Sequence, residues 1–336
     1  MMKSIREFYP LLKKPSRTVI TMHQKPDADA MGSSLALAHF LRGLGHSVQV
    51  ISPTNWAKWL DWMPGATEVV DYEAERAQAD SLLDAAEWLF CLDFNVFIRT
   101  RFMAEKLRQI NCTKVLIDHH QEPDAASFDF GASDTGKSST CEMVYDFIVG
   151  AGYGDAITTE IAECIYGGVV ADTGSFRFSS TSANVHSLVA DLKGRGLDHV
   201  KVHEHLFDNF LENKLRFTGH VLLNRLDFLY EYNTALIAIP KGDLLRFQIK
   251  TGDTEGLVNL PQSVQDIKLV GLVIDRDEER KWSFRSKGNF DCNTFARTYF
   301  NGGGHFHAAG GRSTEPLDEA VRKFKLALQE NELKLQ

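Results

Sequence analysis

The sequence lacks several features that mark other classes of protein. No apolar run reaches the ~18–20 residues that a membrane-spanning helix needs, and the first residues lack the apolar core of a signal peptide. The five cysteines are widely spread and form no Cys-x-x-Cys pair, which argues against a disulfide framework and indicates a reducing compartment. We therefore expect a cytoplasmic protein without a membrane partner.

An excess of basic charge is also missing. The chain has 37 Lys and Arg against 45 Asp and Glu, a net charge of −8. The acidic excess lies in residues 1–210, with 28 acidic and 19 basic residues, while the remainder has 17 and 18. Long duplex nucleic acid is therefore not an expected partner. The acidic first part fits either carboxylates that bind metal ions or a solvated acidic surface.

The 336 residues predict two domains of an α/β protein. In the first part, short β-rich runs alternate with helical stretches, which indicates βαβ units and a mainly parallel sheet flanked by helices. The strands expected there are 17–22, 47–51, 87–94 and 114–117, and the helices are 31–44 and 102–110. From 139 to 229 the pattern is helical, with breaks at the glycines of 167–168 and 194–196.

The last part predicts a smaller α+β domain, across a cleft from the first. Its expected strands are 234–239, 267–274 and 282–285, followed by a glycine-rich turn at 302–304 and a helix from about 317. A helix around 213–230 predicts a connector. The expected organisation is a metal-binding catalytic domain at 1–210, a helical connector at 211–230 and a substrate-binding domain at 231–336.

The first group of candidate site residues follows the first predicted strand and opens a helix. His23, Asp27 and Asp29 lie within seven residues, at the carboxyl end of a strand, where ligand sites of parallel sheets are found. Gly32 is expected to let the backbone turn into the helix. One aspartate could simply cap that helix, but a cap needs only one such residue.

Three further segments place polar side chains after apolar runs. They contain Asp93, the triplet Asp118-His119-His120, and Asp172. A lone aspartate at a strand end is usually a cap or turn residue, and two adjacent histidines can belong to a polar surface turn. Taken together, however, the segments converge on one edge of the predicted sheet.

The combined set is rich in ligands for hard divalent cations. The set supplies two imidazoles and four carboxylates, and the four negative charges would repel one another unless two divalent metal ions balanced them. Histidine and aspartate ligands without thiolate suit Mn²⁺, with Mg²⁺, Co²⁺ or Fe²⁺ as alternatives. Two such ions ~3.5–4 Å apart are the arrangement used to hydrolyse phosphate esters. The predicted metal ligands are His23, Asp27, Asp29, Asp93, His119 and Asp172.

These motifs resemble those of the DHH phosphoesterases. The resemblance rests on HxxPDxDAxGS from His23, the isolated Asp93, the Asp-His-His triplet, DTGxF from Asp172, and GGGH at 302–305 preceded by Arg285-Ser286. The last two are similar to the DHH-associated domain of that superfamily. The length and domain order look most like the NrnA-type enzymes. Asn301 stands where many relatives have a further glycine.

The resemblance implies a role for each residue. One metal would take His23, Asp27 and Asp93, and the other Asp29, His119 and Asp172, with Asp93 bridging. Asp118 would orient a histidine, and His120 would contact the phosphate or the leaving oxygen. In the second domain the resemblance implies that substrate is held by Arg285, Ser286, Gly303, Gly304 and His305.

The implied function is a phosphoric ester hydrolase using a hydroxide activated by two metals. Its substrates would be short single-stranded RNA, cleaved to mononucleotides, and adenosine 3′,5′-bisphosphate (pAp), converted to AMP. Alternatives are a phosphodiesterase for cyclic dinucleotides or pApA, an inorganic pyrophosphatase, or a catalytically silent nucleotide or metal sensor. The resemblance also leads us to expect a homodimer. His203, His205 and the tryptophans at 56, 59 and 62 are expected to be packing or surface residues.

Overall fold

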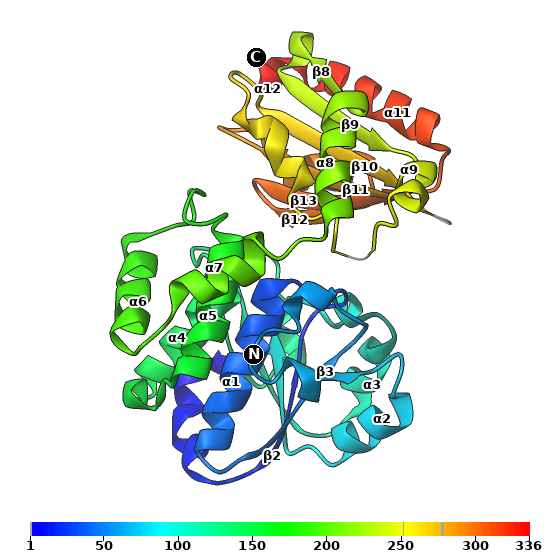
Figure 1. The fold of residues 1–336 in the computed structure, drawn as a ribbon. Helices are drawn as coiled ribbons and strands as arrows, with labels where there is room; N and C mark the ends of the chain where they lie inside the picture. Colours follow the sequence, from blue (N-terminus) through cyan, green and yellow to red (C-terminus); the bar gives the residue numbers. More distant parts are fainter. Residues whose placement is uncertain (1, 251, 277–278) are drawn as a thin grey trace. The chain divides into compact units, whose positions relative to one another are not determined.

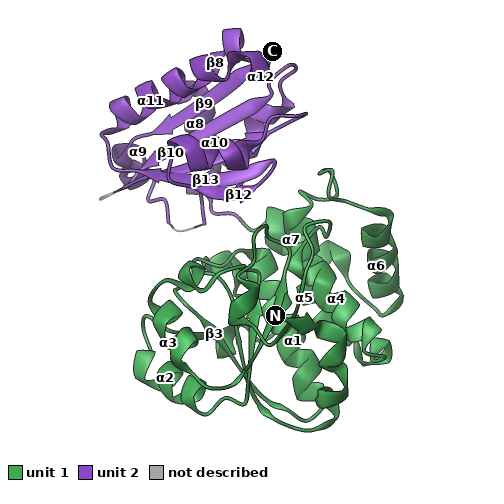
Figure 2. Ribbon diagram, turned by 180° about the vertical axis from the view of Figure 1, so that it is seen from behind, with its two compact units in different colours: residues 1–209 green, residues 210–336 purple. Residues whose placement is uncertain are grey.

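The structure, a computed structural model, describes residues 2–250, 252–276 and 279–336 (Figure 1). It divides into two compact units, residues 1–209 and 210–336, and each is built on its own sheet (Figure 2). The five cysteines are free thiols. Among the described residues, no helix has both the length and the apolar character needed to cross a membrane.

The first unit contains a seven-stranded, fully parallel sheet in the order β1-β7-β6-β5-β2-β3-β4. This confirms the expected parallel α/β fold. The strands are β1 (Lys3–Ser4), β2 (Arg17–Thr21), β3 (Ser47–Ser52), β4 (Val70–Asp71), β5 (Trp88–Leu92), β6 (Thr113–Asp118) and β7 (Phe130–Ser133). The chain runs from β2 outward to β3 and β4, and then returns to place β5 on the other side of β2. The strand order thus reverses between β2 and β5, which is where open parallel sheets bind ligands.

Helices cover both faces of this sheet, so its central strands are buried on both sides. Along β5, Leu89 and Cys91 face one core, whereas Phe90 and Leu92 face the other. On one face α1 (Ala28–Gly43) and α4 (Thr140–Gly150) pack against the strands, α5 (Thr159–Asp172) packs on α1 and α4, and α6 (Ala183–Gly194) and α7 (His199–Phe207) pack on α5. The other face packs against α2 (Arg76–Asp84) and α3 (Ala104–Gln109).

Two glycine predictions are corrected by the packing of α1 against α5. Gly32 lies inside α1, where an added Cβ would be 2.5 Å from the Cys164 carbonyl oxygen, so it serves helix contact and not a turn. Gly168 lies inside α5, where a Cβ would overlap the Cys141 sulfur and come within 2.8 Å of Asp29 Oδ1. The glycine pair at 167–168 therefore does not end a helix but lets two helices approach closely.

The second unit has a six-stranded mixed sheet in the order β12-β13-β11-β10-β9-β8, in which only β9 and β10 are parallel. The strands are β8 (Leu226–Leu229), β9 (Thr234–Ile239), β10 (Leu269–Asp275), β11 (Arg280–Ser286), β12 (Gly303–His305) and β13 (Ala308–Ser313). The helices are α8 (Glu212–Asn224), α9 (Lys241–Arg246), α10 (Cys292–Tyr299), α11 (Leu317–Glu330) and α12 (Glu332–Leu335).

Residues 211–230, assigned to a connector in the sequence analysis, form both α8 and the edge strand β8. Phe217 and Val221 of α8 are fully buried against Ala235 and Ile237 of β9. These residues therefore contribute to the core of the second unit. The opposite face of the six-stranded sheet packs against α10 and α11 around Trp282.

Candidate metal centre

Loops that follow neighbouring parallel strands bring the predicted ligands together. His23 follows β2, Asp93 directly follows β5, and His119 directly follows β6. Because β6, β5 and β2 are adjacent, these side chains meet at one edge of the sheet. Asp172 joins them as the last residue of α5, a helix end and not the strand end or turn that the sequence suggested.

Asp93 lies at the centre of the group, and its two carboxylate oxygens face different histidines. Its Oδ2 is 3.4 Å from His23 Nε2, and its Oδ1 is 3.5 Å from His119 Nε2. The residue is 2% exposed and adopts a left-handed backbone conformation with φ 62°. Aspartate tolerates this conformation better than most residues, and here it turns the side chain back over the sheet edge.

The first group of ligands is centred on His23. Its Nε2 is 3.9 Å from Asp27 Oδ2 in addition to the contact with Asp93. Asp27 Oδ1 accepts hydrogen bonds from the backbone amides of Asp29 and Ala30, both at 3.0 Å. Asp27 therefore caps α1 with one oxygen and faces His23 with the other, so the capping and ligand interpretations both apply.

The second group is centred on His119. Its Nε2 lies 3.4 Å from Asp172 Oδ2 and 3.9 Å from Asp29 Oδ2. Asp29 is fully buried, whereas Asp172 is partly exposed. Possible ligand atoms of Asp29, Asp93 and His119 lie within 4.8 Å of one another, as do those of His23, Asp27 and Asp93. These two clusters of metal-ligand type share Asp93, which also belongs to a third with Asp118 and His120.

The orientation of the two histidines fits a cation better than it fits an empty cluster. His23 Nδ1 is 2.8 Å from the Gln24 carbonyl oxygen, and His119 Nδ1 is 3.3 Å from that of Lys137. A carbonyl oxygen only accepts, so each Nδ1 carries the proton. In the neutral ring the Nε2 lone pair then points at carboxylates, an arrangement that repels unless a cation or a proton lies between them. Metal-bound histidines commonly donate their second nitrogen to a carbonyl in this way.

The pKa values describe the same excess of negative charge. Burial and the charge of Asp93 raise the pKa of Asp29 to about 7, and burial and Asp29 raise the pKa of Asp172 well above its usual range. Burial opposes protonation of His119, but hydrogen bonding to Asp93 and the charge of Asp172 outweigh it and raise the pKa of His119 to about 10. Burial likewise opposes ionisation of Asp93, but hydrogen bonds from His119 and His23 hold its pKa well below the ordinary value.

Metal binding at pH 7 is therefore expected to release protons. In metal-free protein His119 is protonated at that pH and Asp29 is partly protonated, and a ligand must lose its proton to bind a cation. Affinity for Mn²⁺ should accordingly rise with pH, from about pH 6 towards about pH 10. Calorimetry at pH 7 in buffers of different ionisation enthalpy should detect about one proton or more released per chain. Affinity that is independent of pH would contradict this assignment.

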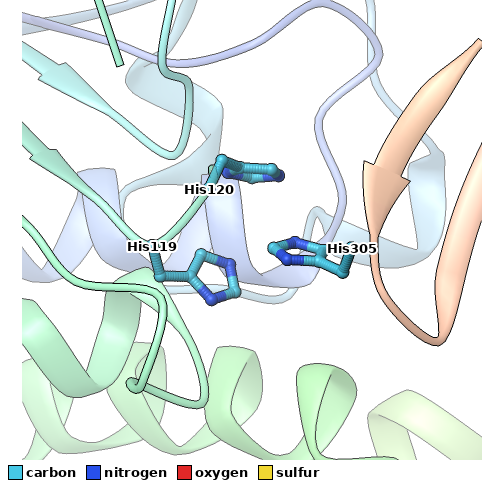
Figure 3. A group of neighbouring side chains, drawn as sticks. All are labelled: His119, His120 and His305. Atoms are coloured by element: carbon cyan, nitrogen blue, oxygen red, sulfur yellow. The ribbon is translucent and has the colours of Figure 1, made fainter. Parts of the chain in front are cut away.

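His120 is held differently from His119, although both imidazoles project from the chain just after β6 (Figure 3). Its Nδ1 donates to Asp118 Oδ1 at 2.7 Å, and burial lowers the pKa of His120 below its usual value. Asp118 Oδ2 is buried with no hydrogen-bond partner among the described residues. Asp118 thus orients the His120 ring, in agreement with the geometry that the orienting role requires.

In the second unit, Arg285 and His305 lie in one row across three strands. Arg285 of β11 and His305 of β12 both pair with Ala308 of β13, which lies between them. Residues opposite one another on adjacent strands project from the same face of a sheet. The arginine and the histidine therefore share a face, separated by the small side chain of Ala308.

Ser286 projects from the opposite face because it follows Arg285 directly on the strand. It is 6% exposed, and its hydroxyl donates to the Phe290 carbonyl oxygen at 2.6 Å. His307 Nδ1 lies 3.1 Å from the same hydroxyl oxygen. The Ser286 side chain thus contacts residues of the second unit on the face opposite to Arg285, and its substrate role stays a prediction.

The two predicted glycines of this unit differ. Gly304 has φ +154°, and an added Cβ would overlap the Ala308 carbonyl oxygen, so the strand pairing itself requires glycine there. A Cβ at Gly303 would meet nothing closer than 3.5 Å. Gly303 pairs with Gly310 of β13, and the atoms nearest to its Cβ position are Asn293 Oδ1 and Arg297 Nε of α10, at 3.5 and 3.6 Å.

The remaining histidines that the sequence offered are packing residues. The ring of His205 stacks on that of Trp62 with centroids 5.0 Å apart, and His203 Nε2 lies 3.0 Å from the Tyr166 hydroxyl. Both belong to α7, and neither belongs to a metal-ligand cluster among the described residues. Trp56, Trp59 and Trp62 pack on the main core of the first unit.

The sequence analysis missed two residues that contact the centre. Thr140 and Cys141 begin α4, and their backbone amides donate to the two oxygens of Asp29 at 2.7 and 2.8 Å. The sequence does carry a signal for this helix start, because Ser139 followed by Glu142 is a capping pattern. It carries no signal that the helix start faces Asp29, which is 111 residues away in the chain.

Comparison with known proteins agrees with the fold. Residues 17–169 match the DHH family, N-terminal domain, and residues 234–330 match the DHHA1 domain. A crystal structure of an exopolyphosphatase-related protein from Bacteroides fragilis is 35% identical, with a TM-score of 0.94, and covers 98% of this chain and 97% of that one. The chain belongs to the DHH family and is a phosphoric ester hydrolase.

Several relatives of the chain share one name, and two of them are matched as follows. The bifunctional oligoribonuclease and PAP phosphatase NrnA of Bacillus subtilis is 28% identical over 306 residues, covering 90% of this chain and 91% of the relative. The protein of the same name from Thermus thermophilus is 28% identical over 326 residues, covering 93% and 89%.

Proposed function

We propose that this protein hydrolyses short single-stranded oligoribonucleotides to mononucleotides and pAp to AMP, with two divalent metal ions, Mn²⁺ being the first candidate. The names of the Bacillus and Thermus relatives support the substrate class, because each chain is matched over about nine-tenths of its length. The net charge of −8 supports short substrates over long duplexes.

The observation that carries the proposal is the position of Asp93 between two histidines. One carboxylate oxygen is directed to each, at 3.4 and 3.5 Å, so a single residue belongs to both ligand groups. We assign His23, Asp27 and Asp93 to one ion and Asp29, Asp93, His119 and Asp172 to the other. Bound divalent cations would acidify water and neutralise phosphate charge at this position.

The residues around the ions have separate tasks. The carbonyl oxygens that accept from His23 and His119 keep both Nε2 atoms directed at the carboxylates. Asp118 holds the ring of His120 and fixes its Nδ1 as a donor to the carboxylate. His120 can then present its Nε2 to the phosphate or the leaving oxygen, and a proton on Nε2 would stabilise negative charge developing there.

We assign recognition of a substrate phosphate to the face of the second unit that carries Arg285 and His305. The guanidinium offers a planar fork that matches two phosphate oxygens, and His305 lies two strands away in the same row. Ala308 and Gly310 are small residues of β13 on this face, so a ligand can approach the backbone between Arg285 and His305 closely. A terminal phosphate held there would favour substrates of a few nucleotides.

A parallel substrate assay tests the proposal. Metal-stripped protein would be reloaded with Mn²⁺ and given pAp, di- to pentaribonucleotides, cyclic dinucleotides, pApA, pyrophosphate and inorganic polyphosphate at equal concentration. We expect turnover of pAp and of the short oligonucleotides, and none before metal is restored. Polyphosphate is included because the Bacteroides relative is described as exopolyphosphatase-related.

The other outcomes distinguish the alternatives. Release of phosphate from pyrophosphate or polyphosphate alone would replace the nucleotide substrates with inorganic ones. Exclusive turnover of cyclic dinucleotides or pApA would favour the phosphodiesterase alternative. Binding of Mn²⁺ and nucleotide without turnover of any compound would identify a sensor.

A further inference from the structure

A fully buried threonine outside the predicted ligand set contacts two of its carboxylates. Thr140 is the first residue of α4. Its hydroxyl oxygen is 3.0 Å from Asp93 Oδ1, and its backbone amide donates to Asp29 Oδ2 at 2.7 Å. Asp93 follows β5 and Asp29 lies in α1. Thr140 therefore links two separate segments whose side chains must lie close together for the metal centre to form.

The hydroxyl bond restrains the rotation of the Asp93 carboxylate. An ionised carboxylate only accepts, so the Thr140 hydroxyl donates, and its single proton is committed to Oδ1. With Oδ1 held on that side, Oδ2 is turned towards His23, at 3.4 Å. Rotation of the Asp93 carboxylate about its Cβ–Cγ bond decides which histidine each oxygen faces. After a quarter turn, neither oxygen would be directed at its histidine.

Helix capping does not account for the threonine hydroxyl. The N-cap of α4 is Ser139, whose Oγ accepts from the Glu142 amide at 3.0 Å. The amides of Thr140 and Cys141 are used by Asp29. The first three amides of the helix are therefore all satisfied without the Thr140 side chain.

We propose that Thr140 is a positioning residue for the metal centre, whose hydroxyl sets the rotation of the shared ligand Asp93 while its amide holds Asp29. The inference rests on the proposed function, since it concerns how the centre binds its ions. It adds a residue from α4 to the segments that build the centre. Groups that hold ligands in this way typically change metal affinity 10–100-fold when they are lost.

Metal titration of the full chain tests this proposal. Metal-stripped wild type, Thr140→Val, Thr140→Ala and Thr140→Ser would be titrated with Mn²⁺ and followed by calorimetry and by the EPR signal of free Mn²⁺. We expect about 10–100-fold weaker binding for the valine and alanine variants and a change within about threefold for serine, which keeps the hydroxyl. Thr234→Val is the matched control, because Thr234 is equally buried and donates to the Tyr232 carbonyl in the second unit.

The outcomes separate this proposal from the proposed function. If wild type binds no Mn²⁺, the proposed metal centre itself is wrong. If wild type binds and folded Thr140→Ala binds equally well, Thr140 does not position the ligands. Equal losses in the serine and alanine variants would assign the effect to packing of the methyl group and would also overturn the proposal. Should the valine variant fail to fold, the comparison of alanine with serine gives the same decision.

Discussion

Replacing Asp93 should abolish turnover of every substrate while the protein stays folded. Asp93→Asn removes the negative charge that the ligand groups of His23 and His119 share, and Asp93→Ala removes the carboxylate altogether. We expect both variants to lose about 10³-fold or more in kcat/KM on pAp and on trinucleotides, because the loss affects both ions and all phosphate chemistry at the centre. Metal analysis should show fewer than the two ions per chain expected for wild type.

The backbone at this position decides which variant is the cleaner test. Asp93 has φ 62°, a conformation that asparagine adopts readily and alanine does not. Alanine should therefore cost about 1 kcal/mol of folding free energy that asparagine avoids. The matched control is Asp266→Asn, because Asp266 is an exposed aspartate of the second unit with φ 64°. Turnover retained by folded Asp93→Asn would refute the shared-ligand role.

Replacing Arg285 should weaken substrate binding and leave metal content unchanged. Arg285 belongs to the second unit, whereas all the proposed metal ligands belong to the first. Loss of a guanidinium–phosphate pair is expected to raise KM for pAp about 10–100-fold, with a smaller effect on kcat. Steady-state kinetics with saturating Mn²⁺ and metal analysis of the purified variant measure the two quantities.

Two further variants make this test specific. Arg285→Lys keeps the charge but not the planar fork, and we expect it to restore only part of the affinity. Arg312→Ala removes an exposed arginine of β13, whose ion pair with Glu279 is 3.6 Å long, and should leave KM unchanged. If Arg285→Ala loses metal or unfolds while KM is normal in the remaining folded fraction, the arginine is structural and does not bind a phosphate.

Much of the first unit could be predicted from local sequence. β2, β3, β5 and β6 were expected within two residues at most of their ends, because buried parallel strands are short apolar runs between helical stretches. Polar residues directly after such runs, as at Asp93 and His119, must then meet at the carboxyl edge of the sheet. Hence the meeting of these side chains could be predicted without knowledge of the strand order, while their role as metal ligands stays a prediction.

Other features were readable in principle but were misjudged. The glycines at 167–168 were interpreted as a break, although glycine within an apolar helix can equally permit close helix contact, as it does here between α5 and α1. Arg285 and Ser286 were both predicted to hold substrate, and that stays a prediction, but neighbouring residues of a strand point to opposite faces. The alternation rule alone would have separated them.

The amino-acid sequence by itself determined the fold class, the residue types of the proposed metal centre and the place of Asp93 and His119 directly after strands. It did so because burial periodicity and the polarity of side chains are local properties of the chain. Only the tertiary structure decided that the oxygens of Asp93 divide between His23 and His119 and that the Thr140 hydroxyl lies 3.0 Å from Asp93 Oδ1. Those facts depend on how α4 packs beside β5 and α1, and a contact between side chains 47 residues apart follows from the packing of whole elements, not from any local pattern.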